Sequence, residues 1–508
     1  MKKVLYILFH RSVFVGLSLL AQIATLLVMV VTFSEYTDVF YWCLVAISVM
    51  AALAIVGSSM EPGYKIAWLL LILPFPVFGG IFYLMVGGGA TPKRTRRRMQ
   101  GMLKKTAQVL RDDFKADDLL PLGGDAAGQA NYLERRAACP AYTNTETEYF
   151  SLGDSAFPRM LEELEKAEKY IFLEYFIIQP GVFWDSILAI LERKAAQGVE
   201  VRVIYDDMGC MFTLPRDYNE ILTRKGIQCR VFNRFLPVMS LRLNNRDHRK
   251  LMIIDGKVGF TGGINLADEY INLRKRYGHW KDSAIFLEGD AVWSMTVMFL
   301  TMWDHIASWD EDFDRFRPPA APVRPWTGYV QPYTDTPLDN ETVGQAVYLN
   351  MIAKAKKYIY ITTPYLVIDV ATNTALCNAA KSGVDVRLIT PHIPDKQYVF
   401  QVTKAHYPPL LEAGVKIYEY TPGFIHAKNF VVDDRFATVG TVNLDYRSLF
   451  LHFEDGVWLC EAPCIRDIRQ DFENTLKVCQ PISLRRARHL NLLVQLYRSI
   501  LRVFAPLM

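Results

Sequence analysis

The residues of this chain that could do chemistry form two copies of one short pattern. His248 and Lys250 are followed by Asp255 and then by a glycine-rich loop that ends in Asn265. The second copy has the same residue types at the same offsets, in His426, Lys428, Asp433 and Asn443. Both copies read H-x-K-x4-D-x6-G-(G/T)-x-N. A histidine can attack phosphorus or carry a proton, and lysine and asparagine can hold phosphate oxygens, so the pattern predicts chemistry at a phosphodiester.

The spacing of the pattern also predicts how these residues are positioned. A histidine and a lysine two residues apart point to the same face of a strand. The apolar runs 251–254 and 429–432 predict buried strands, each followed by a turn. A second strand then leads to a loop whose substrate-binding candidates are Gly263, Asn265, Thr441 and Asn443. Two such units packed face to face would place two histidines, two lysines and two asparagines around one pocket.

Four carboxylates near the pattern are candidates for supporting roles. Asp255 and Asp433 stand at strand ends, where they act either in catalysis or in structural hydrogen bonding. Asp282 and Glu454 occupy matching places, each just before an apolar strand. A carboxylate at such a place can fix the tautomer of a histidine ring. We therefore take Asp282 and Glu454 as candidates for orienting the two histidines.

The repetition extends upstream of the pattern, which indicates a duplicated domain. Two pairs of upstream segments match each other, residues 167–173 with 355–361 and 197–204 with 382–389. Each copy is expected to run helix, strand, helix, strand and then the pattern, as in βαβ units with helices on the faces of a mixed or parallel sheet. We predict one repeat over residues 141–329 and the other over residues 330–482.

The N-terminal residues 1–92 have the composition of a membrane segment. Residues 12–34 and 39–60 are each long and apolar enough to cross a bilayer, which needs about 20 residues. A third apolar run, residues 66–92, contains Pro74 and Pro76 and is either a kinked crossing or a re-entrant segment. Basic residues stand before the first run and after the third, and both groups can be cytoplasmic only if the number of crossings is even. This favours two spans and one segment that dips in and returns.

Two basic regions flank the repeats. Residues 93–140 begin with a cluster of Lys and Arg and form a basic linker, whose cluster at the membrane edge is expected to meet anionic headgroups. Residues 483–508 predict a basic amphipathic helix. Such a helix lies either on the protein's own core or on the membrane surface, and the clustered arginines favour the membrane.

Composition argues against several other classes of protein. The net charge of +4 gives no case for nucleic-acid binding. The 8 cysteines are scattered without a C-x-x-C pair, which is typical of reduced thiols in a cytoplasmic region. No three- or four-ligand carboxylate cluster stands out, so we expect neither a metal nor another cofactor.

The doubled pattern resembles that of the phospholipase D superfamily. A narrower resemblance to bacterial cardiolipin synthases is carried by four segments, residues 65–74, 78–84, 362–365 and 440–448. The resemblance implies an α/β fold of two duplicated phospholipase-D-like α/β/α domains packed face to face and preceded by N-terminal transmembrane helices. It also implies a phosphatidyltransferase in the bacterial cytoplasmic membrane, with its catalytic domains in the cytoplasm.

The same resemblance implies the reaction and the partners. Cardiolipin synthases join two phosphatidylglycerols and release glycerol, without a cofactor. The implied catalytic residues are His248, Lys250, Asp255, His426, Lys428 and Asp433. His248 would be the nucleophile that becomes phosphohistidine, and His426 the general acid and then base. The implied partners are phosphatidylglycerol and other anionic lipids; the oligomeric state stays open.

Three other functions fit parts of the sequence. A membrane phospholipase D that releases phosphatidic acid would need the same residues, because only the attacking group differs. A phosphodiesterase acting on nucleic acid would need a basic, aromatic-lined groove, which the net charge and the apolar N-terminus disfavour. A non-enzymatic membrane scaffold would not need two intact copies of the pattern.

Overall fold

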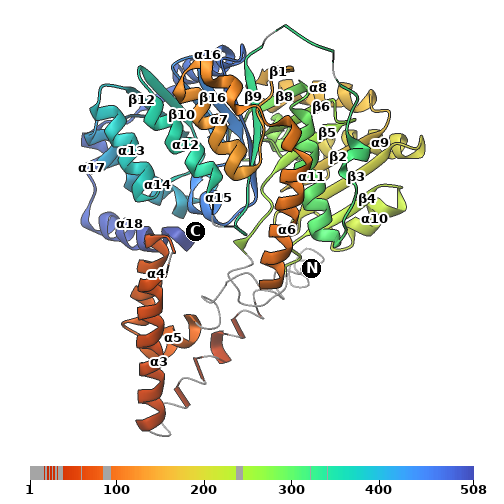
Figure 1. Ribbon diagram of the computed structural model, residues 1–508. Helices are drawn as coiled ribbons and strands as arrows, with labels where there is room; N and C mark the ends of the chain where they lie inside the picture. Colours follow the sequence, from red (N-terminus) through yellow and green to blue (C-terminus); the bar gives the residue numbers. More distant parts are fainter. Residues whose placement is uncertain are drawn as a thin grey trace.

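The computed structural model describes residues 38–58, 60–83, 93–235, 244–320, 322–325, 327–339 and 341–507, with scattered residues between 17 and 32. Most of the chain forms two α/β units around two sheets, and a narrower arm of helices projects from one side of them (Figure 1).

The first sheet has seven strands in the order β1-β8-β6-β5-β2-β3-β4. These strands are β1 (Thr145–Phe150), β2 (Tyr170–Tyr175), β3 (Glu200–Asp206), β4 (Gln228–Phe232), β5 (Lys250–Ile254), β6 (Val258–Gly262) and β8 (Ala284–Gly289). Strands β2, β3 and β4 are parallel, and the pairs from β2 through β5, β6 and β8 to β1 are antiparallel. The apolar runs at β2 and β5 are fully buried, as expected of strands covered on both faces.

The second sheet repeats this order as β9-β18-β16-β15-β10-β12-β13, with β19 added at the edge. Its strands are β9 (Tyr329–Asp335), β10 (Tyr358–Thr362), β12 (Asp385–Pro391), β13 (Lys416–Tyr420), β15 (Asn429–Val432), β16 (Phe436–Gly440), β18 (Glu454–Cys460) and β19 (Cys479–Pro481). The identical order and the identical mixture of parallel and antiparallel pairs confirm two duplicated α/β domains.

Helices cover the sheets and join the two units. The helices of the first unit are α8 (Gly153–Glu165), α9 (Val182–Ala196), α10 (Tyr218–Arg224) and α11 (Val292–Ala307). Those of the second are α12 (Val343–Lys354), α13 (Val370–Lys381), α14 (Gln397–Glu412), α15 (Tyr446–Phe450) and α16 (Ile465–Leu476). Strands β6 and β8 contact β16 and β18 across the interface, and one apolar core takes residues from both sheets, such as Phe172 and Val439.

Short strands also cross the interface between the units. β7 (His279–Lys281) pairs in parallel with β14 (Gly423–Ile425), so residues before Asp282 lie beside residues before His426. Asp247 forms a parallel bridge with Phe453, so residues before His248 lie beside residues before Glu454. A third short pair, β11 (Leu366–Val367) with β17 (Leu444–Asp445), lies within the second unit.

The basic linker is mostly helical in the structure. α6 (Lys93–Val109) packs along α11, and α7 (Gly124–Ala137) packs on α12 and β9. Arg98 at the start of α6 donates to the backbone oxygen of Asp304 and to the hydroxyl of Ser308, each at 2.6 Å. At least this cation of the cluster therefore binds the protein itself.

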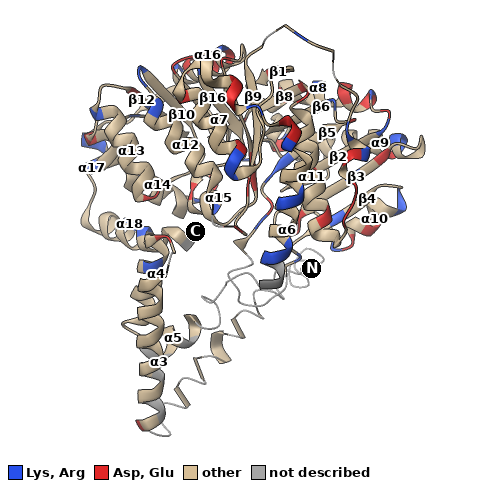
Figure 2. Cartoon of the chain, in the orientation of Figure 1, with Lys and Arg blue, Asp and Glu red and all other residues tan. Residues whose placement is uncertain are grey.

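The N-terminal arm contains α3 (Asp38–Gly57), α4 (Pro62–Ile72) and α5 (Pro76–Phe82), with almost no charged residues (Figure 2). The third apolar run is broken where Pro76 begins α5, because proline has no N–H for a continuous helix. Among the residues that the structure describes, no helix combines the length and the hydropathy that a membrane crossing requires. The expected span over residues 12–34 lies largely outside the described residues, and the predicted crossings are not confirmed.

The C-terminal residues form two helices, α17 (Leu484–Arg488) and α18 (Leu492–Phe504). α18 contacts α14 and the start of the arm at α4, so it lies where the arm meets the second unit (Figure 1). None of its residues is buried, and Leu492, Leu493 and Leu496 are more than half exposed.

Candidate active site

Each histidine of the repeated pattern is held by backbone from the other repeat. The N–H of His248 donates to the carbonyl of Phe453 at 2.9 Å, and the N–H of His426 donates to the carbonyl of Lys281 at 2.7 Å. These carbonyls belong to the residues immediately before Glu454 and Asp282. The short strands across the interface therefore place each histidine next to a carboxylate of the partner repeat.

The two rings are fixed through their Nδ1 atoms. Nδ1 of His248 lies 3.0 and 2.9 Å from the two carboxylate oxygens of Glu454, and Nδ1 of His426 lies 2.7 Å from an oxygen of Asp282. Both carboxylates are fully buried. An ionised carboxylate can only accept a hydrogen bond, so we assign the ring proton to Nδ1 and the lone pair to Nε2. Nδ1 of His426 also lies 2.8 Å from Nζ of Lys428, and the assignment there follows the shorter contact with Asp282. Each ring is thereby prepared to act through Nε2.

Burial and neighbouring charge determine the protonation of these pairs. Burial lowers the pKa of His248 to about 3 and that of His426 to about 4, although the paired carboxylates favour the charged rings. Burial raises the pKa of Glu454 and of Asp282, but several neighbours together outweigh it and both pKa values are lowered. These neighbours are His248 and His452 at Glu454, and His426, Lys428 and the N–H of Ser283 at Asp282. Near neutral pH each pair consists of a neutral imidazole and an ionised carboxylate.

The two lysines of the pattern are buried in the same site. Lys250 and Lys428 each donate to the carbonyl of the histidine two residues earlier. Burial lowers the pKa of Lys250 to about 8 and that of Lys428 to about 7. Asp282 raises the pKa of Lys250 and Glu454 raises that of Lys428, so carboxylates of both repeats act on both lysines.

Asp255 and Asp433 make structural hydrogen bonds, the alternative to catalysis that the sequence left open, and their catalytic role stays a prediction. Asp255 accepts the backbone N–H groups of residues 168, 169 and 170, at 2.7 to 2.8 Å. Asp433 accepts those of residues 356, 357 and 358, at 2.7 to 2.9 Å. Asp255 directly follows β5 and Asp433 directly follows β15. Both have positive φ values, 52° for Asp255 and 55° for Asp433. They join strand ends to the preceding helix–strand connection.

The asparagines differ from each other in their contacts. The Oδ1 of Asn265 accepts the N–H of Ile177 at 2.9 Å, and its Nδ2 donates to the hydroxyl of Tyr270 at 2.7 Å, so its amide is engaged by the protein. The Oδ1 of Asn443 is buried without a protein partner. Of the two, Asn443 keeps a polar atom for a ligand.

Gly263 and Thr441 adjoin the two carboxylates, and their contact with substrate stays a prediction. A Cβ at Gly263 would lie 2.0 Å from Oδ1 of Asp282, so only glycine lets this short carboxylate approach the loop. At the equivalent place the hydroxyl of Thr441 donates to Glu454 and accepts the N–H of Asp455 at 2.9 Å. Glu454 is long enough to leave room for the side chain of Thr441, whereas the shorter Asp282 needs a glycine at the equivalent position.

Sequence reasoning missed two further residues. Asp455 accepts the N–H of Lys250 at 3.3 Å and the hydroxyl of Thr261, and burial raises its pKa to about 7. The ring of His452 lies 5.5 Å from that of His248, centroid to centroid, and its Nδ1 lies 3.5 Å from Glu454. His452 lies in the bend before β18, so the alternation of side chains along a strand does not predict its place beside Glu454.

His452 also bears on metal binding. Over the described part of the chain, His248, His452 and Glu454 form a group whose ligand atoms lie within 4.8 Å of one another. The hydrogen bond from His248 already engages Glu454. Catalysis without a metal stays a prediction.

Comparisons with known proteins agree with this geometry. Residues 160–288 and 348–476 match the family described as "Cardiolipin synthase, PLD-like domain". Residues 46–88 match the family described as "Phospholipase_D-nuclease N-terminal". The two repeats therefore match the same family separately.

Whole-chain relatives point the same way. A Streptococcus mutans protein described as uncharacterized is 44% identical over 90% of this chain and 99% of its own length. A cardiolipin synthase of a Geobacillus species is 34% identical over 91% of this chain and 92% of its own length. The solved phosphatidylserine synthase of Haemophilus influenzae has a TM-score of 0.56 and 13% identity, covering 75% of this chain and 97% of that one, which shows a shared fold. The chain belongs to the cardiolipin synthase family of the phospholipase D superfamily and is an enzyme of the phosphatidyltransferase class.

Proposed function

We propose that this enzyme makes cardiolipin from two phosphatidylglycerols through a phosphohistidine intermediate. The observation that carries the proposal is the pair of neutral histidines, each held at Nδ1 by a carboxylate of the other repeat. Two equivalent imidazoles at one site suit a reaction with two displacements at the same phosphorus, because one ring attacks while the other moves protons.

In the first displacement Nε2 of His248 attacks phosphorus of the donor lipid, forming a P–N bond. The P–O bond to glycerol breaks, and His426 gives its proton to the departing oxygen. Binding of the anionic phosphate favours a protonated His426, since an adjacent negative charge raises the pKa of a ring that burial alone keeps low. Lys250 and Lys428 hold the non-bridging oxygens as negative charge builds on them.

In the second displacement His426 takes the proton from a hydroxyl of the second phosphatidylglycerol. That oxygen attacks phosphorus, the P–N bond breaks, and His248 is regenerated. The products are cardiolipin and glycerol, and no electrons are exchanged with another group. Water in place of the lipid hydroxyl would release phosphatidic acid, which is the competing function.

The proposed setting is the bacterial cytoplasmic membrane, because both substrates are bilayer lipids. The apolar arm of α3 to α5 and the exposed leucines of α18 lie on one side of the catalytic units, which supports this setting (Figure 1). We propose that the catalytic units face the cytoplasm and that the arm holds them at the bilayer.

The test is a product assay on the purified protein in phosphatidylglycerol vesicles, with and without EDTA. We expect cardiolipin and glycerol in equal amounts, undiminished by the chelator. Phosphatidic acid as the main product would establish the hydrolase instead. Activity that disappears with EDTA and returns only with added metal would overturn the metal-free mechanism.

The roles of the two histidines are tested with a donor whose leaving group needs no proton. His426→Ala should then still accumulate a labelled phosphoenzyme, and His248→Ala should trap none. A phosphoenzyme in His248→Ala alone would reverse the assignment while keeping the reaction.

A further inference from the structure

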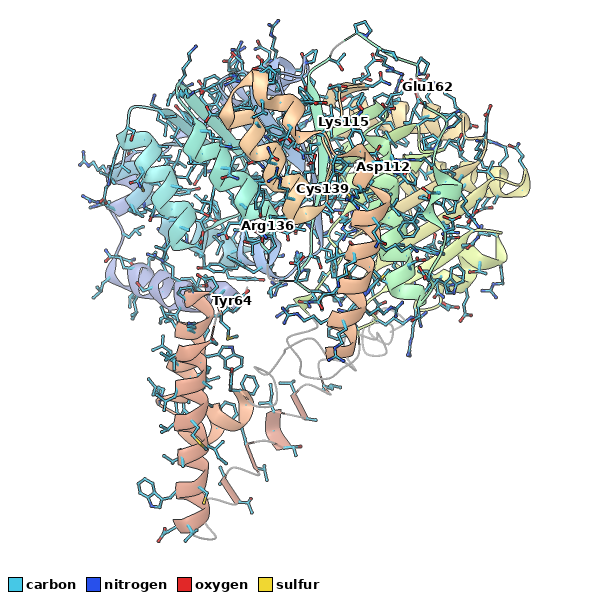
Figure 3. The ribbon with its side chains drawn as sticks, viewed as in Figure 1. Tyr64, Asp112, Lys115, Arg136, Cys139 and Glu162 are labelled. Carbon is cyan, nitrogen blue, oxygen red and sulfur yellow. The ribbon has the colours of Figure 1, made fainter. Side chains whose placement is uncertain are left out.

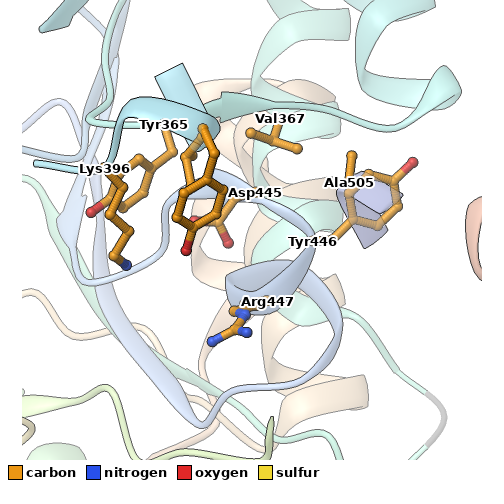
Figure 4. A pocket seen from close by; sticks show the side chains of 9 residues that line it. Tyr365, Val367, Lys396, Asp445, Tyr446, Arg447 and Ala505 are labelled. Carbon is orange, nitrogen blue, oxygen red and sulfur yellow. The ribbon is translucent and has the colours of Figure 1, made fainter. Parts of the chain in front are cut away.

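A second pocket lies beside the active site, where the start of α14, β11, α15 and the C-terminal turn η7 (Ala505–Leu507) meet (Figure 4). Its space for water-sized groups is about 50 Å³, and it is partly open to solvent. One water-sized group needs roughly 10–15 Å³ on this measure, so the space holds a few such groups. It suits a phosphate group rather than a whole lipid.

The walls of this pocket carry more positive than negative charge. Lys396 and Arg447 supply two cations, and Asp445 is the acidic residue of the lining. The carboxylate of Asp445 accepts the N–H of Ser448 at 2.8 Å and so caps α15. Nζ of Lys396 lies 5.5 Å from the ring centroid of Tyr365, which leaves the ammonium at the aromatic wall. With two cations and one carboxylate, the lining has a net positive charge, which favours an anion.

The apolar side of the pocket continues into the arm. Val367, Val399, Tyr446 and Ala505 belong both to the lining and to an apolar cluster that includes Tyr64 of α4. The ring of Tyr64 lies 6.0 Å from that of Tyr446, and Tyr64 stands where α4 meets the catalytic units (Figure 3). A headgroup in the pocket could therefore keep its acyl chains along the apolar arm.

The pocket also adjoins the reacting groups. Asp445 lies two residues after Asn443, in the loop that closes the second copy of the pattern. Its charge raises the pKa of Lys428, and the charge of His452 lowers that of Asp445. The pairing of β11 with β17 joins Val367 of the pocket wall to Asp445, so a ligand here would lie beside the loop that carries Asn443.

We propose that this pocket binds the phosphodiester of the second phospholipid, the acceptor, through Lys396 and Arg447. The inference rests on the proposed function, in which the acceptor keeps its own phosphate while its glycerol hydroxyl attacks the phosphohistidine. Binding that phosphate beside the active site directs the hydroxyl at phosphorus and displaces the water that would otherwise hydrolyse the intermediate. The pocket thereby selects transfer over hydrolysis.

The experiment measures the ratio of cardiolipin to phosphatidic acid made from phosphatidylglycerol vesicles. Lys396 is exposed, so Lys396→Glu should fold, and it should lower this ratio at least about tenfold. Lys396→Arg should restore the ratio. The matched control is Lys381→Glu, which makes the same change in net charge. Lys381 is exposed at the C-terminal end of α13 and does not line the pocket, so this variant should leave the ratio unchanged.

A soluble acceptor, glycerophosphoglycerol, separates headgroup recognition from lipid recognition. If the pocket reads the phosphodiester alone, this compound becomes an acceptor for the unaltered enzyme and a much weaker one for Lys396→Glu. If it accepts no phosphatidyl group but Lys396→Glu still lowers the lipid ratio, the site takes lipid only. An unchanged ratio in Lys396→Glu, or an equal change in Lys381→Glu, overturns the inference. An unaltered enzyme that makes no cardiolipin overturns the proposed function itself.

Discussion

At the scale of single residues, burial is what makes the site reactive. His248, Lys250, His426 and Lys428 are all at most 7% exposed. Desolvation disfavours charge, so the histidines stay neutral and the lysines hold their protons less firmly than in water. The same residue types on a surface would be solvated and would lack both properties.

The lysines predict an alkaline limb in the pH profile. Burial lowers the pKa of Lys428 to about 7 and that of Lys250 to about 8, so their charge is present at lower pH and lost as pH rises through these values. The phosphodiester stays anionic throughout this range, so kcat/KM should fall between about pH 7 and pH 9. Lys428→Arg should move the limb to higher pH, since guanidinium keeps its proton. A limb at the same pH in Lys428→Arg would assign it to another group.

At the scale of elements, the two aspartates of the pattern hold strands together. Each receives three backbone N–H groups at the entrance to β2 or β10 and binds it to the end of β5 or β15. The number of residues between the histidine and the aspartate is therefore set by the length of the strand that lies between them, β5 or β15. The presence of an aspartate in both copies of the pattern is therefore accounted for by its hydrogen bonds to the backbone.

Asp255→Ala is expected to lower stability and leave the chemistry intact. Three backbone donors, one of them buried, would lose their charged acceptor, which should lower the free energy of unfolding by about 2–4 kcal/mol. Urea unfolding in detergent measures this, and Asp255→Asn should lose less because it keeps one acceptor oxygen. A loss of kcat above about 100-fold with unchanged unfolding would instead return Asp255 to the catalytic group.

The exposed apolar face of α18 predicts a role at the membrane surface. Replacing Leu493, Leu496 and Ile500 by serine removes about 1.5–3 kcal/mol of burial per side chain if this face enters the bilayer. The rate on phosphatidylglycerol vesicles should fall severalfold, and the rate on a short-chain lipid dispersed as monomers should stay the same. Leu273→Ser, at an exposed leucine of the first unit, is the control. Equal losses on both substrates would point to a role within the protein.

At the scale of the whole molecule, the two repeats exchange the groups that complete each other. Each repeat supplies one histidine and the carboxylate for the other histidine. This exchange gives the two halves an approximate two-fold arrangement. The surroundings of the two histidines differ, because Trp280 contacts His426 whereas His452 contacts His248. Neither His248 nor His426 takes its orienting carboxylate from its own repeat.

This exchange predicts which step each carboxylate supports. Glu454→Gln should slow the formation of the phosphoenzyme at His248 by roughly 10²–10⁴-fold with every donor, because the amide no longer selects the Nδ1–H tautomer. Asp282→Asn should impair the steps of His426 and be rescued by a donor whose leaving group needs no proton. Rapid quench with labelled donor measures both. The reverse pattern would show that the carboxylates act within their own repeats.

Local patterns in the sequence determined the duplicated α/β fold and the residues around the histidines. Alternation along strands placed His248 and Lys250 on one face, and matching places before apolar strands singled out Asp282 and Glu454. These properties depend on neighbours within about six residues or on likeness between the two copies, so they can be read without a fold.

Only the tertiary structure decided which groups meet. It paired His248 with Glu454 and His426 with Asp282, separated Asp255 and Asp433 from both, and added His452 and Asp455 to the site. It also joined Lys396 to the loop of Asn443 in a second pocket. Such contacts join residues up to about 200 positions apart, as His248 and Glu454 are. They depend on the packing of two whole sheets, and no local spacing encodes that packing.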